Sequence, residues 1–444
     1  ATEGRLPVLP YLVDWRGQLR GGDPPPTDSI PNELYPYCRF VLDWYCEPDN
    51  VRWRDNPPRI VTVPGYGYFP SGYQYVANHP PLYYVLMAPF YLLSQGWSVE
   101  AQQYLLRIAA IPFGLLTVFA AWRTTHLLFP GDFFMLTGVA AFVAFQPQIS
   151  YEAAMVNNDI VAIAIFSLII WGIVAGMKTS FPPRLCLLLG VALGAGLLVK
   201  GTTTTIAPVI GLAMLWTLGL RDWRQLIGRG LLVLAPAAVT AAPWYLYLYR
   251  TYGDFSGLKR VADLQYWNSP MGGFFELLTD PDFVIWRFRE SWGEYGWRLI
   301  HFRESLLIAI AIPMVAGTVG VGLYALARWR GWRIWGTLTG PEPAWQGKAL
   351  WILVIACAVA YLAVVQFGTT FALAQARYFF PVVNAAAILL ILGLRTLIPW
   401  RFRPAGQGLI LAALIALNVF IFSAYILPFT ATFDQPTLPW VWRD

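Results

Sequence analysis

The sequence predicts an all-α membrane protein that crosses the bilayer many times. Of its 444 residues, 57% are hydrophobic and only 13% are charged, whereas soluble domains carry about 25% charged residues. The mean hydropathy is +0.50, and the apolar residues form runs that approach the roughly 20 residues a membrane-crossing helix needs. The 21 tryptophans and 23 tyrosines are typical of the aromatic belts at the two membrane interfaces.

Ten apolar segments predict a bundle of about ten transmembrane helices. They are residues 105–128, 134–150, 159–177, 185–199, 202–220, 230–250, 305–327, 349–367, 379–397 and 407–429. Residues 82–95 are also apolar but short, and prolines constrain them at positions 80, 81 and 89. We therefore expect an interfacial or re-entrant helix at 82–95 and not a full span.

The basic residues of the short connections fall in every second connection between the predicted helices. They are Arg123; Lys178 and Arg184; Arg221, Arg224 and Arg229; Arg328, Arg330, Arg333 and Lys348; and Arg395, Arg401 and Arg403. The positive-inside rule places all five groups in the cytoplasm. The net charge of +6 is thereby explained by topology, and we expect no nucleic-acid binding because the chain has no basic tract or recognition motif.

This alternation divides the chain into five parts. Residues 1–104 form an extracytoplasmic first loop region that includes the helix 82–95, and 105–250 form the first half of the bundle. Residues 251–304 form a second extracytoplasmic region, 305–429 the second half, and 430–444 an extracytoplasmic tail. An exported first loop requires translocation, so we expect a transmembrane segment or a signal peptide before Ala1.

Cys38 and Cys46 could form a disulfide only if the chain bends between them, because eight residues of continuous helix span about 12 Å.

Three basic residues lie outside the alternating pattern, at the predicted outer ends of helices. Lys200 follows "GAGLLV", Arg377 lies in "ALAQARYFFP" and Arg107 in "YLLRIAAIPFG". A cation at such a place is costly without a partner. Either each side chain extends to the interface, or the three bind a shared anion, for which phosphate is the natural candidate. The threonines of "KGTTTT" offer hydroxyl donors to that anion or hydrogen bonds within the bundle.

A polar group opens the predicted helix 159–177 in the stretch "EAAMVNNDIVAIAIF". Asn157, Asn158 and Asp159 are typical caps of a helix N-terminus, where the helix dipole favours negative charge. In the competing interpretation Asp159 and Asn158 are groups of a site that contact the substrate or orient one of its hydroxyls.

The first loop region supplies further candidates. In "DSIPNELYPYCRFVLDWYCEPDN" the acids include Asp28 and Glu33. Such acids are commonly solvated, but one that folds over the membrane near the cations could act as a general base. His79, followed by two prolines, fits a capping residue where a helix starts. The sequence has no P-loop, dinucleotide-binding glycine pattern, metal-spaced Cys/His set or serine elbow, so it indicates no metal site and no bound cofactor.

Several of these stretches together resemble the GT-C superfamily of polytopic glycosyltransferases, in particular dolichyl-phosphate-mannose protein mannosyltransferases and bacterial aminoarabinose transferases. The stretches are "NHPPLYYVLMAPFYLLS", "YLLRIAAIPFGLLTV", "AAMVNNDIVAIA", "GAGLLVKGTTTT", "LYRTYGDFSGL", "ESWGEYGWR" and "QARYFFPVVNAAAILLILGL". They occur in the family's order over about residues 30–400. Each is weak alone, and their order makes the resemblance specific for the fold.

The resemblance implies an inverting transferase in the bacterial cytoplasmic membrane, with its large loops and C-terminus outside. Its donor would be a lipid-linked sugar, a polyprenyl-phosphate sugar that enters from the bilayer. Lys200 and Arg377 match positions where cations hold the lipid phosphate, and His79 stands where relatives place His or Lys before Pro-Pro. The catalytic carboxylate of the family lies in the first outer loop and deprotonates the acceptor hydroxyl.

One position departs from the family pattern and keeps an alternative open. In "SIPNELYPY" the expected catalytic Asp is replaced by Asn32, which cannot take up a proton. Glu33 or Asp28 would have to substitute for it. Otherwise the chain is a catalytically inactive, GT-C-like interaction subunit of a larger membrane complex. A transporter is disfavoured, because no inverted repeat or pair of broken helices stands out.

Overall fold

The computed structural model describes residues 60–63, 67–70, 78–259, 270–295, 300–332, 334–335, 343–371 and 375–431. The chain forms two compact units. The first combines Ala1–Leu106, Ala242–Leu277 and Val365–Ala374, and the second combines Arg107–Ala241, Leu278–Val364 and Gln375–Asp444. The predicted residues Asp28, Asn32, Glu33, Cys38 and Cys46 lie outside the described residues.

The predicted all-α, multi-pass fold is confirmed. Among the described residues, eight helical segments are long and apolar enough to cross a membrane, and a bent pair makes up to nine. The eight are Glu100–Leu128, Asp159–Thr179, Gly201–Leu218, Trp223–Tyr252, Glu304–Arg330, Ala344–Gly368, Ala376–Leu397 and Trp400–Phe429. All ten predicted segments are helical. Two of them, 134–150 and 185–199, are not among the eight long helices and differ from a simple span.

The predicted span 134–150 is two helices, α5 (Phe133–Phe145) and α6 (Pro147–Ala153), which meet at 58°. Between them, Gln146 has an extended backbone, and its side-chain oxygen accepts the Ile149 N–H at 2.7 Å. Pro147 lacks the N–H that would continue α5, so a new helix starts with its own cap. The predicted span 185–199 is α8 (Pro183–Leu197), whose 15 residues cover about 22 Å of a roughly 30 Å core.

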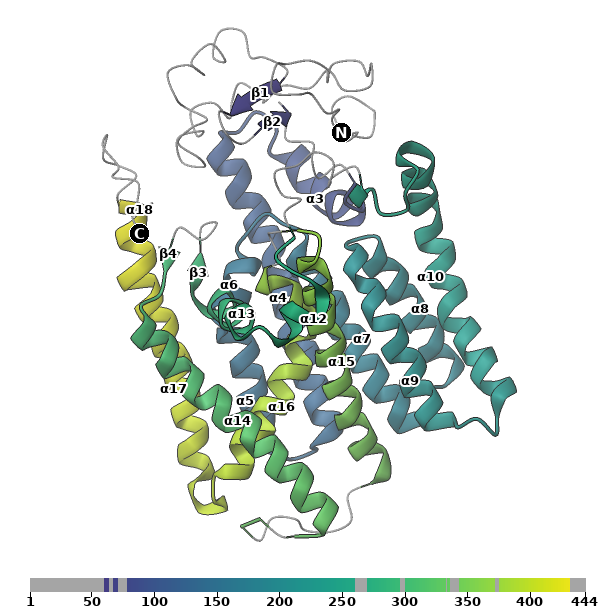
Figure 1. Cartoon of the computed structure of the whole chain (residues 1–444), viewed down its shortest axis with the longest axis vertical. Coiled ribbons are helices and arrows are strands. Elements are labelled where there is room, and N and C mark those ends of the chain that lie inside the picture. The colour runs from purple at the N-terminus through teal and green to yellow at the C-terminus, as the bar shows by residue number, and fades with distance from the viewer. Residues whose placement is uncertain are drawn as a thin grey trace. The chain divides into compact units, whose positions relative to one another are not determined.

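The second unit is built around α7 (Asp159–Thr179). Its apolar window is 78% buried, against 11% for the segment Trp400–Phe429, whose apolar side chains are left for lipid. A helix that is apolar on all sides belongs in the interior. It packs against α8, α9 (Ala207–Leu218) and α16 (Val383–Leu397), and α16 in turn packs on α5 (Figure 1).

The backbones of α14 (Glu304–Arg330) and α16 approach each other closely at glycine residues. A Cβ added to Gly393 of α16 would lie 1.8 Å from the carbonyl oxygen of Gly317. A Cβ on Gly320 would lie 2.1 Å from the Gly393 oxygen. Glycines permit this backbone contact, which is a common way for membrane helices to associate.

The remaining elements of the second unit include the segment that follows residue 277. It contains α13 (Pro281–Gly293) and the antiparallel pair β3 (Glu294–Tyr295) and β4 (Ile300–His301). The described part of the chain ends in η8 (Trp400–Phe402), α17 (Arg403–Ile421), the π-helix η9 (Phe422–Ile426) and α18 (Leu427–Ala431). Three long helices, α4 (Val99–Leu128), α10 (Trp223–Tyr252) and α15 (Ala344–Gly368), each contribute residues to both units.

The first unit contains the antiparallel pair β1 (Ile60–Val63) and β2 (Gly67–Pro70), the helix α3 (Leu82–Leu93) and the first four residues of the helix α12 (Phe274–Thr279). Helix α3 coincides with the predicted short helix 82–95. Its 12 residues cover about 18 Å, and Pro89 lies inside it. It is therefore too short to cross the hydrocarbon core, and its position at the interface stays a prediction.

A compact turn after α10 orders the residues around the first unit's Asn78. The Asp254 carboxylate accepts the N–H of Ser256 at 3.1 Å and that of Lys259 at 3.3 Å. The Asn78 amide donates to the Ser256 carbonyl at 3.0 Å. Partial burial acts to raise the pKa of Asp254. The hydrogen bonds that its carboxylate accepts from the backbone of Ser256 and Lys259 and from the Ser256 hydroxyl outweigh this effect, so the pKa is lowered.

Candidate functional site

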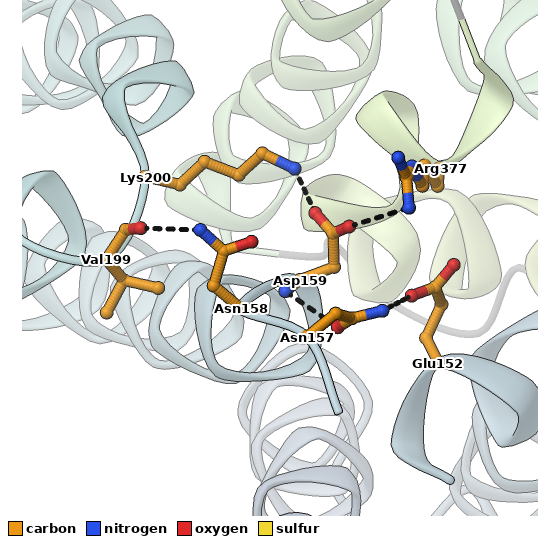
Figure 2. Close-up of polar contacts among 7 residues, drawn as sticks. All are labelled: Glu152, Asn157, Asn158, Asp159, Val199, Lys200 and Arg377. Atoms are coloured by element: carbon orange, nitrogen blue, oxygen red, sulfur yellow. Dashed lines mark hydrogen bonds and ion pairs between the residues drawn. The ribbon is translucent and has the colours of Figure 1, made fainter. Parts of the chain in front are cut away.

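A buried carboxylate at the start of α7 brings two of the predicted cations together. Asp159 is 5% exposed, and its Oδ1 contacts Lys200 Nζ. Its other oxygen, Oδ2, lies 3.5 Å from Nη1 of Arg377 (Figure 2). The two cations therefore converge on one carboxylate, although they lie far apart in the sequence. Both charged groups contact Asp159.

Each cation stands at the start of a 3₁₀-helix. Lys200 is the N-cap residue of η6 (Gly201–Ile206), and Arg377 is the second residue of η7 (Ala376–Val382). The Lys200 N–H donates to the Gly196 carbonyl at 2.8 Å, which closes the turn at the end of α8. Each 3₁₀-helix runs directly into an α-helix, so the backbone near both cations is held by long elements.

An aromatic ring lies beside the two cations. Lys200 Nζ is 4.8 Å from the ring centroid of Tyr378, and Arg377 Cζ is 5.7 Å from it. A cation over an aromatic face is stabilised electrostatically. The side chains of Lys200 and Arg377 are 16% and 34% exposed, so both cations keep an accessible part, whereas Asp159 is enclosed.

The two asparagines before Asp159 make separate contacts. The Asn157 side-chain oxygen accepts the Asp159 N–H at 2.9 Å, which is the capping role that the sequence suggests. Asn158 makes no side-chain cap on α7, and its amide donates to the Val199 carbonyl at 3.1 Å (Figure 2). Asn158 therefore ties the start of α7 to the residue before Lys200.

A second buried carboxylate, Glu152 of α6, joins this cluster and was missed in the sequence analysis. It is 4% exposed, and its Oε2 accepts a hydrogen bond from the Asn157 amide (Figure 2). With both carboxylates ionised, the formal charges of Glu152, Asp159, Lys200 and Arg377 sum to zero. A signal was available, because an acid inside an apolar segment is unusual and suggests a functional site.

The threonines of "KGTTTT" serve the bundle in part. The hydroxyl of Thr204 donates to the Gly201 carbonyl at 2.9 Å, and that of Thr205 to the Thr202 carbonyl at 2.8 Å. These two hydroxyls therefore support the 3₁₀ turn, as the alternative in the sequence analysis expected.

The other predicted site residues lie in different places. Arg107 belongs to α4, and its Nε is buried without a hydrogen-bond partner among the described residues. His79 belongs to the first unit, directly after Asn78 and before α3. In the part of the chain that the structure describes, no three His, Cys, Asp or Glu side chains lie close enough together to hold a metal ion.

Comparisons with known proteins point to lipid-phosphate-dependent transferases. The chain is 27% identical over 184 residues to the undecaprenyl phosphate-alpha-4-amino-4-deoxy-L-arabinose arabinosyl transferase of Pseudomonas aeruginosa (strain UCBPP-PA14). The corresponding transferase of Pseudomonas paraeruginosa (strain DSM 24068 / PA7) is likewise 27% identical over 184 residues. The predicted resemblance to aminoarabinose transferases is confirmed. The match covers 38% of this chain and 31% of each relative, so the chain matches less than a third of their length.

Two solved structures are also similar. The apo state of ArnT from Cupriavidus metallidurans aligns with a TM-score of 0.49 and 17% identity, covering 82% of this chain and 56% of that one. An Archaeoglobus fulgidus oligosaccharyltransferase complex with Zn and sulfate aligns with a TM-score of 0.44 and 16% identity, covering 81% of this chain and 45% of that one. No protein-family model matches the chain.

Proposed function

We propose that this chain is an inverting GT-C-type glycosyltransferase that takes a sugar from a polyprenyl-phosphate donor and transfers it to an acceptor hydroxyl on the extracytoplasmic face. The observation that supports it most is the convergence of Lys200 and Arg377 on one buried carboxylate (Figure 2). Two cations from distant segments suit a phosphate, whose several oxygens can bind both. The sequence similarity to undecaprenyl-phosphate-dependent transferases supports the same donor class.

The reaction proposed here breaks the bond between the anomeric carbon and the phosphate oxygen. The acceptor oxygen attacks that carbon from the opposite face, so the sugar inverts its configuration. Negative charge grows on the leaving phosphate, and fixed cations beside it stabilise the transition state more than the ground state. Lys200 and Arg377 are the residues we assign to this role.

The proton of the acceptor hydroxyl requires a base. Asp159 lies with the cations, and we propose it as a catalytic carboxylate or as the group that orients the acceptor. Glu33 and Asp28 of the first loop region are the alternative bases, and Asn158, His79 and Arg107 are proposed to contact the substrate or its phosphate.

The proposal places the protein in the bacterial cytoplasmic membrane, where membrane lipids surround it and its donor reaches the site through the bilayer. The large loop regions and the C-terminus would face outside, on the side of the acceptor.

A second function rests on the charge balance of the site. With both carboxylates ionised, Glu152 and Asp159 balance the two cations, and the resemblance puts Asn32 at the family's catalytic Asp position. A catalytically inactive subunit, which keeps the fold and binds other proteins of a membrane assembly, would have the same features.

The test is to measure binding of undecaprenyl phosphate to the purified chain, together with transfer from polyprenyl-phosphate sugars. We compare the wild type with Lys200→Ala and Arg377→Ala. The matched control is Lys348→Ala, because Lys348 also hydrogen-bonds within the bundle, through Nζ to the Trp216 carbonyl at 2.8 Å. Charge-assisted hydrogen bonds are worth about 1.5–3 kcal/mol, so each site variant should bind at least about tenfold more weakly.

The outcomes separate the two functions. Binding and turnover by the wild type, lost in both site variants and kept in Lys348→Ala, support the transferase. Binding without turnover of any donor favours the inactive subunit. A folded wild type that binds no undecaprenyl phosphate contradicts the proposed phosphate site.

A further inference from the structure

The N–H group that opens η7 is bound by a side chain from another helix. The first N–H groups of a helix have no partner inside it, and the N-cap residue Gln375 makes no side-chain cap. Instead, Glu290 of α13 accepts the Ala376 N–H at its Oε2, at a distance of 2.9 Å. Ala376 directly precedes Arg377, so this bond fixes the backbone from which the guanidinium extends.

Glu290 is itself held in place by a buried ion pair. It is 7% exposed, and its Oε2 lies 3.1 Å from Nη1 of Arg287, one turn earlier on α13. Arg287 is equally buried, and its Cζ lies 4.9 Å from the ring centroid of Phe283. A buried charge is costly without a partner, and Arg287 offsets the charge of the Glu290 carboxylate.

Helix α13 is fixed in turn to the bend between α5 and α6. The amide of Gln146 donates to the Ser291 carbonyl at 2.5 Å, and that of Gln148 to the Glu294 carbonyl at 2.5 Å. Both glutamines are buried. The C-terminal end of α13 is therefore attached to the segment that carries Glu152, and through Glu290 to the segment that carries Arg377.

We propose that Glu290 is a positioning residue for Arg377. By accepting the Ala376 N–H, it sets the first turn of η7 and directs the guanidinium toward Asp159 and the phosphate. The inference rests on the proposed function, because it assigns the phosphate as the ligand of Arg377. It also gives a role to the "ESWGEYGWR" stretch, which begins at Glu290 and contributes no group to the cluster in Figure 2.

The experiment measures the dissociation constant of undecaprenyl phosphate for the full chain in lipid nanodiscs. Glu290→Ala removes the acceptor and should weaken binding about tenfold, the lower end of what supporting partners contribute at binding sites. Glu290→Gln keeps an acceptor oxygen, so its affinity should stay within about twofold of wild type. In the Arg377→Ala background, Glu290→Ala should cause no further loss, because the two residues act through one contact.

A second variant covers the case in which Glu290→Ala, which removes the carboxylate that pairs with Arg287, does not fold. Ala376→Pro deletes the donated N–H while adding two ring carbons at a buried position, and proline is compatible with the first position of a helix. The extended backbone of Gln375, with φ −101° and ψ 148°, is the conformation that precedes proline. We expect the same tenfold loss in affinity. Arg289→Ala is the matched control, because Arg289 on the same helix pairs with Glu304 and not with η7.

Two results would overturn the proposal. One is wild-type affinity in Glu290→Ala and Ala376→Pro while Arg377→Ala is impaired, which leaves the proposed function standing. The other is an equal loss from Glu290→Ala with and without Arg377, which shows an action independent of that residue. If the wild type itself binds no undecaprenyl phosphate, the proposed function fails first and this inference fails with it.

Discussion

At the scale of single residues, the proposed phosphate would compete with Asp159 for the same two cations. Replacing Asp159 by Asn removes the negative charge but keeps the size, so we expect undecaprenyl phosphate to bind roughly tenfold more tightly. The free energy of unfolding should fall by about 2 kcal/mol, because partly buried cations lose their partner. Transfer should fall despite the tighter binding. Equilibrium binding, chemical denaturation and a transfer assay measure the three effects.

The control for Asp159→Asn is Asp132→Asn. Asp132 caps a helix by accepting the Met135 N–H, and like Asp159 it pairs with an arginine, its Oδ2 lying 2.5 Å from Arg395 Nε. That substitution keeps an acceptor oxygen for the cap but removes the charge that pairs with Arg395, so it should lower stability by about 1 kcal/mol and leave phosphate affinity unchanged. Weaker phosphate binding by Asp159→Asn would contradict the competition.

The turn at Asp254 predicts an acid-sensitive region in the first unit. The folded pKa of Asp254 lies below its ordinary value of 3.8, so the ionised form stabilises the turn. This contribution is present above about pH 4 and is lost as the pH falls through the folded pKa. Hydrogen-exchange protection factors of the Leu258 and Lys259 amides should decrease over that range, while amides of α7 keep theirs.

A variant separates this effect from general acid unfolding. Asp254→Asn should show reduced protection of the same two amides already at neutral pH, and little further change on acidification. Equal protection of these amides in wild type and variant at neutral pH would rule out the ionised carboxylate as their support.

At the scale of elements, the contact of α14 with α16 depends on glycine. Gly393→Ala places a methyl group where the Gly317 carbonyl lies, so the helices must separate, at a cost of about 2 kcal/mol. Gly322→Ala is the matched control, because a Cβ there meets nothing within 4 Å and alanine favours a helix by about 1 kcal/mol. Thermal unfolding in detergent should show a lower Tm for Gly393→Ala alone. Equal Tm values would show that the contact adapts.

The helices could be predicted because their apolar residues are concentrated in long runs, but the break in 134–150 could not. A hydropathy average treats Gln146 as one polar residue in an apolar run. The bend depends on where its side chain binds: the oxygen caps α6, and the amide reaches Ser291. Such a partner, far away in sequence, has no local signature. For the same reason the role of Glu290 was not foreseen.

The site could be predicted in part. Lys200 and Arg377 are predicted because cations at apolar helix ends need partners, and Asp159 because it belongs to the polar group that opens the helix 159–177. The structure brings these three into contact. Glu152 was not predicted, because in the sequence it stands apart from the more conspicuous asparagines and no pattern links it to them. It reaches the cluster through Asn157, after a bend that the sequence does not reveal.

At the scale of the whole molecule, the alternation of basic connections predicts which ends of the helices face the cytoplasm. We expect Asp282→Cys, at the start of α13, to react with a membrane-impermeant maleimide in intact cells. Arg224→Cys, at the start of α10, should react only after the membrane is opened. Both positions are exposed, and both substitutions are made after the native cysteines are replaced. Labelling of Arg224→Cys in intact cells would invert the predicted orientation.

The two 3₁₀-helices that begin at the cations would become shorter if they were rewound as α-helix. A 3₁₀-helix rises about 2.0 Å per residue and an α-helix about 1.5 Å, so rewinding the seven residues of η7 as α-helix would shorten it by about 3.5 Å. This shortening is comparable with the 3.5 Å between Arg377 Nη1 and Asp159 Oδ2. With α16 unmoved, such a change of winding would displace Arg377 along the helix axis by up to that amount, and Pro381, which has no N–H to donate to the Arg377 carbonyl, opposes it.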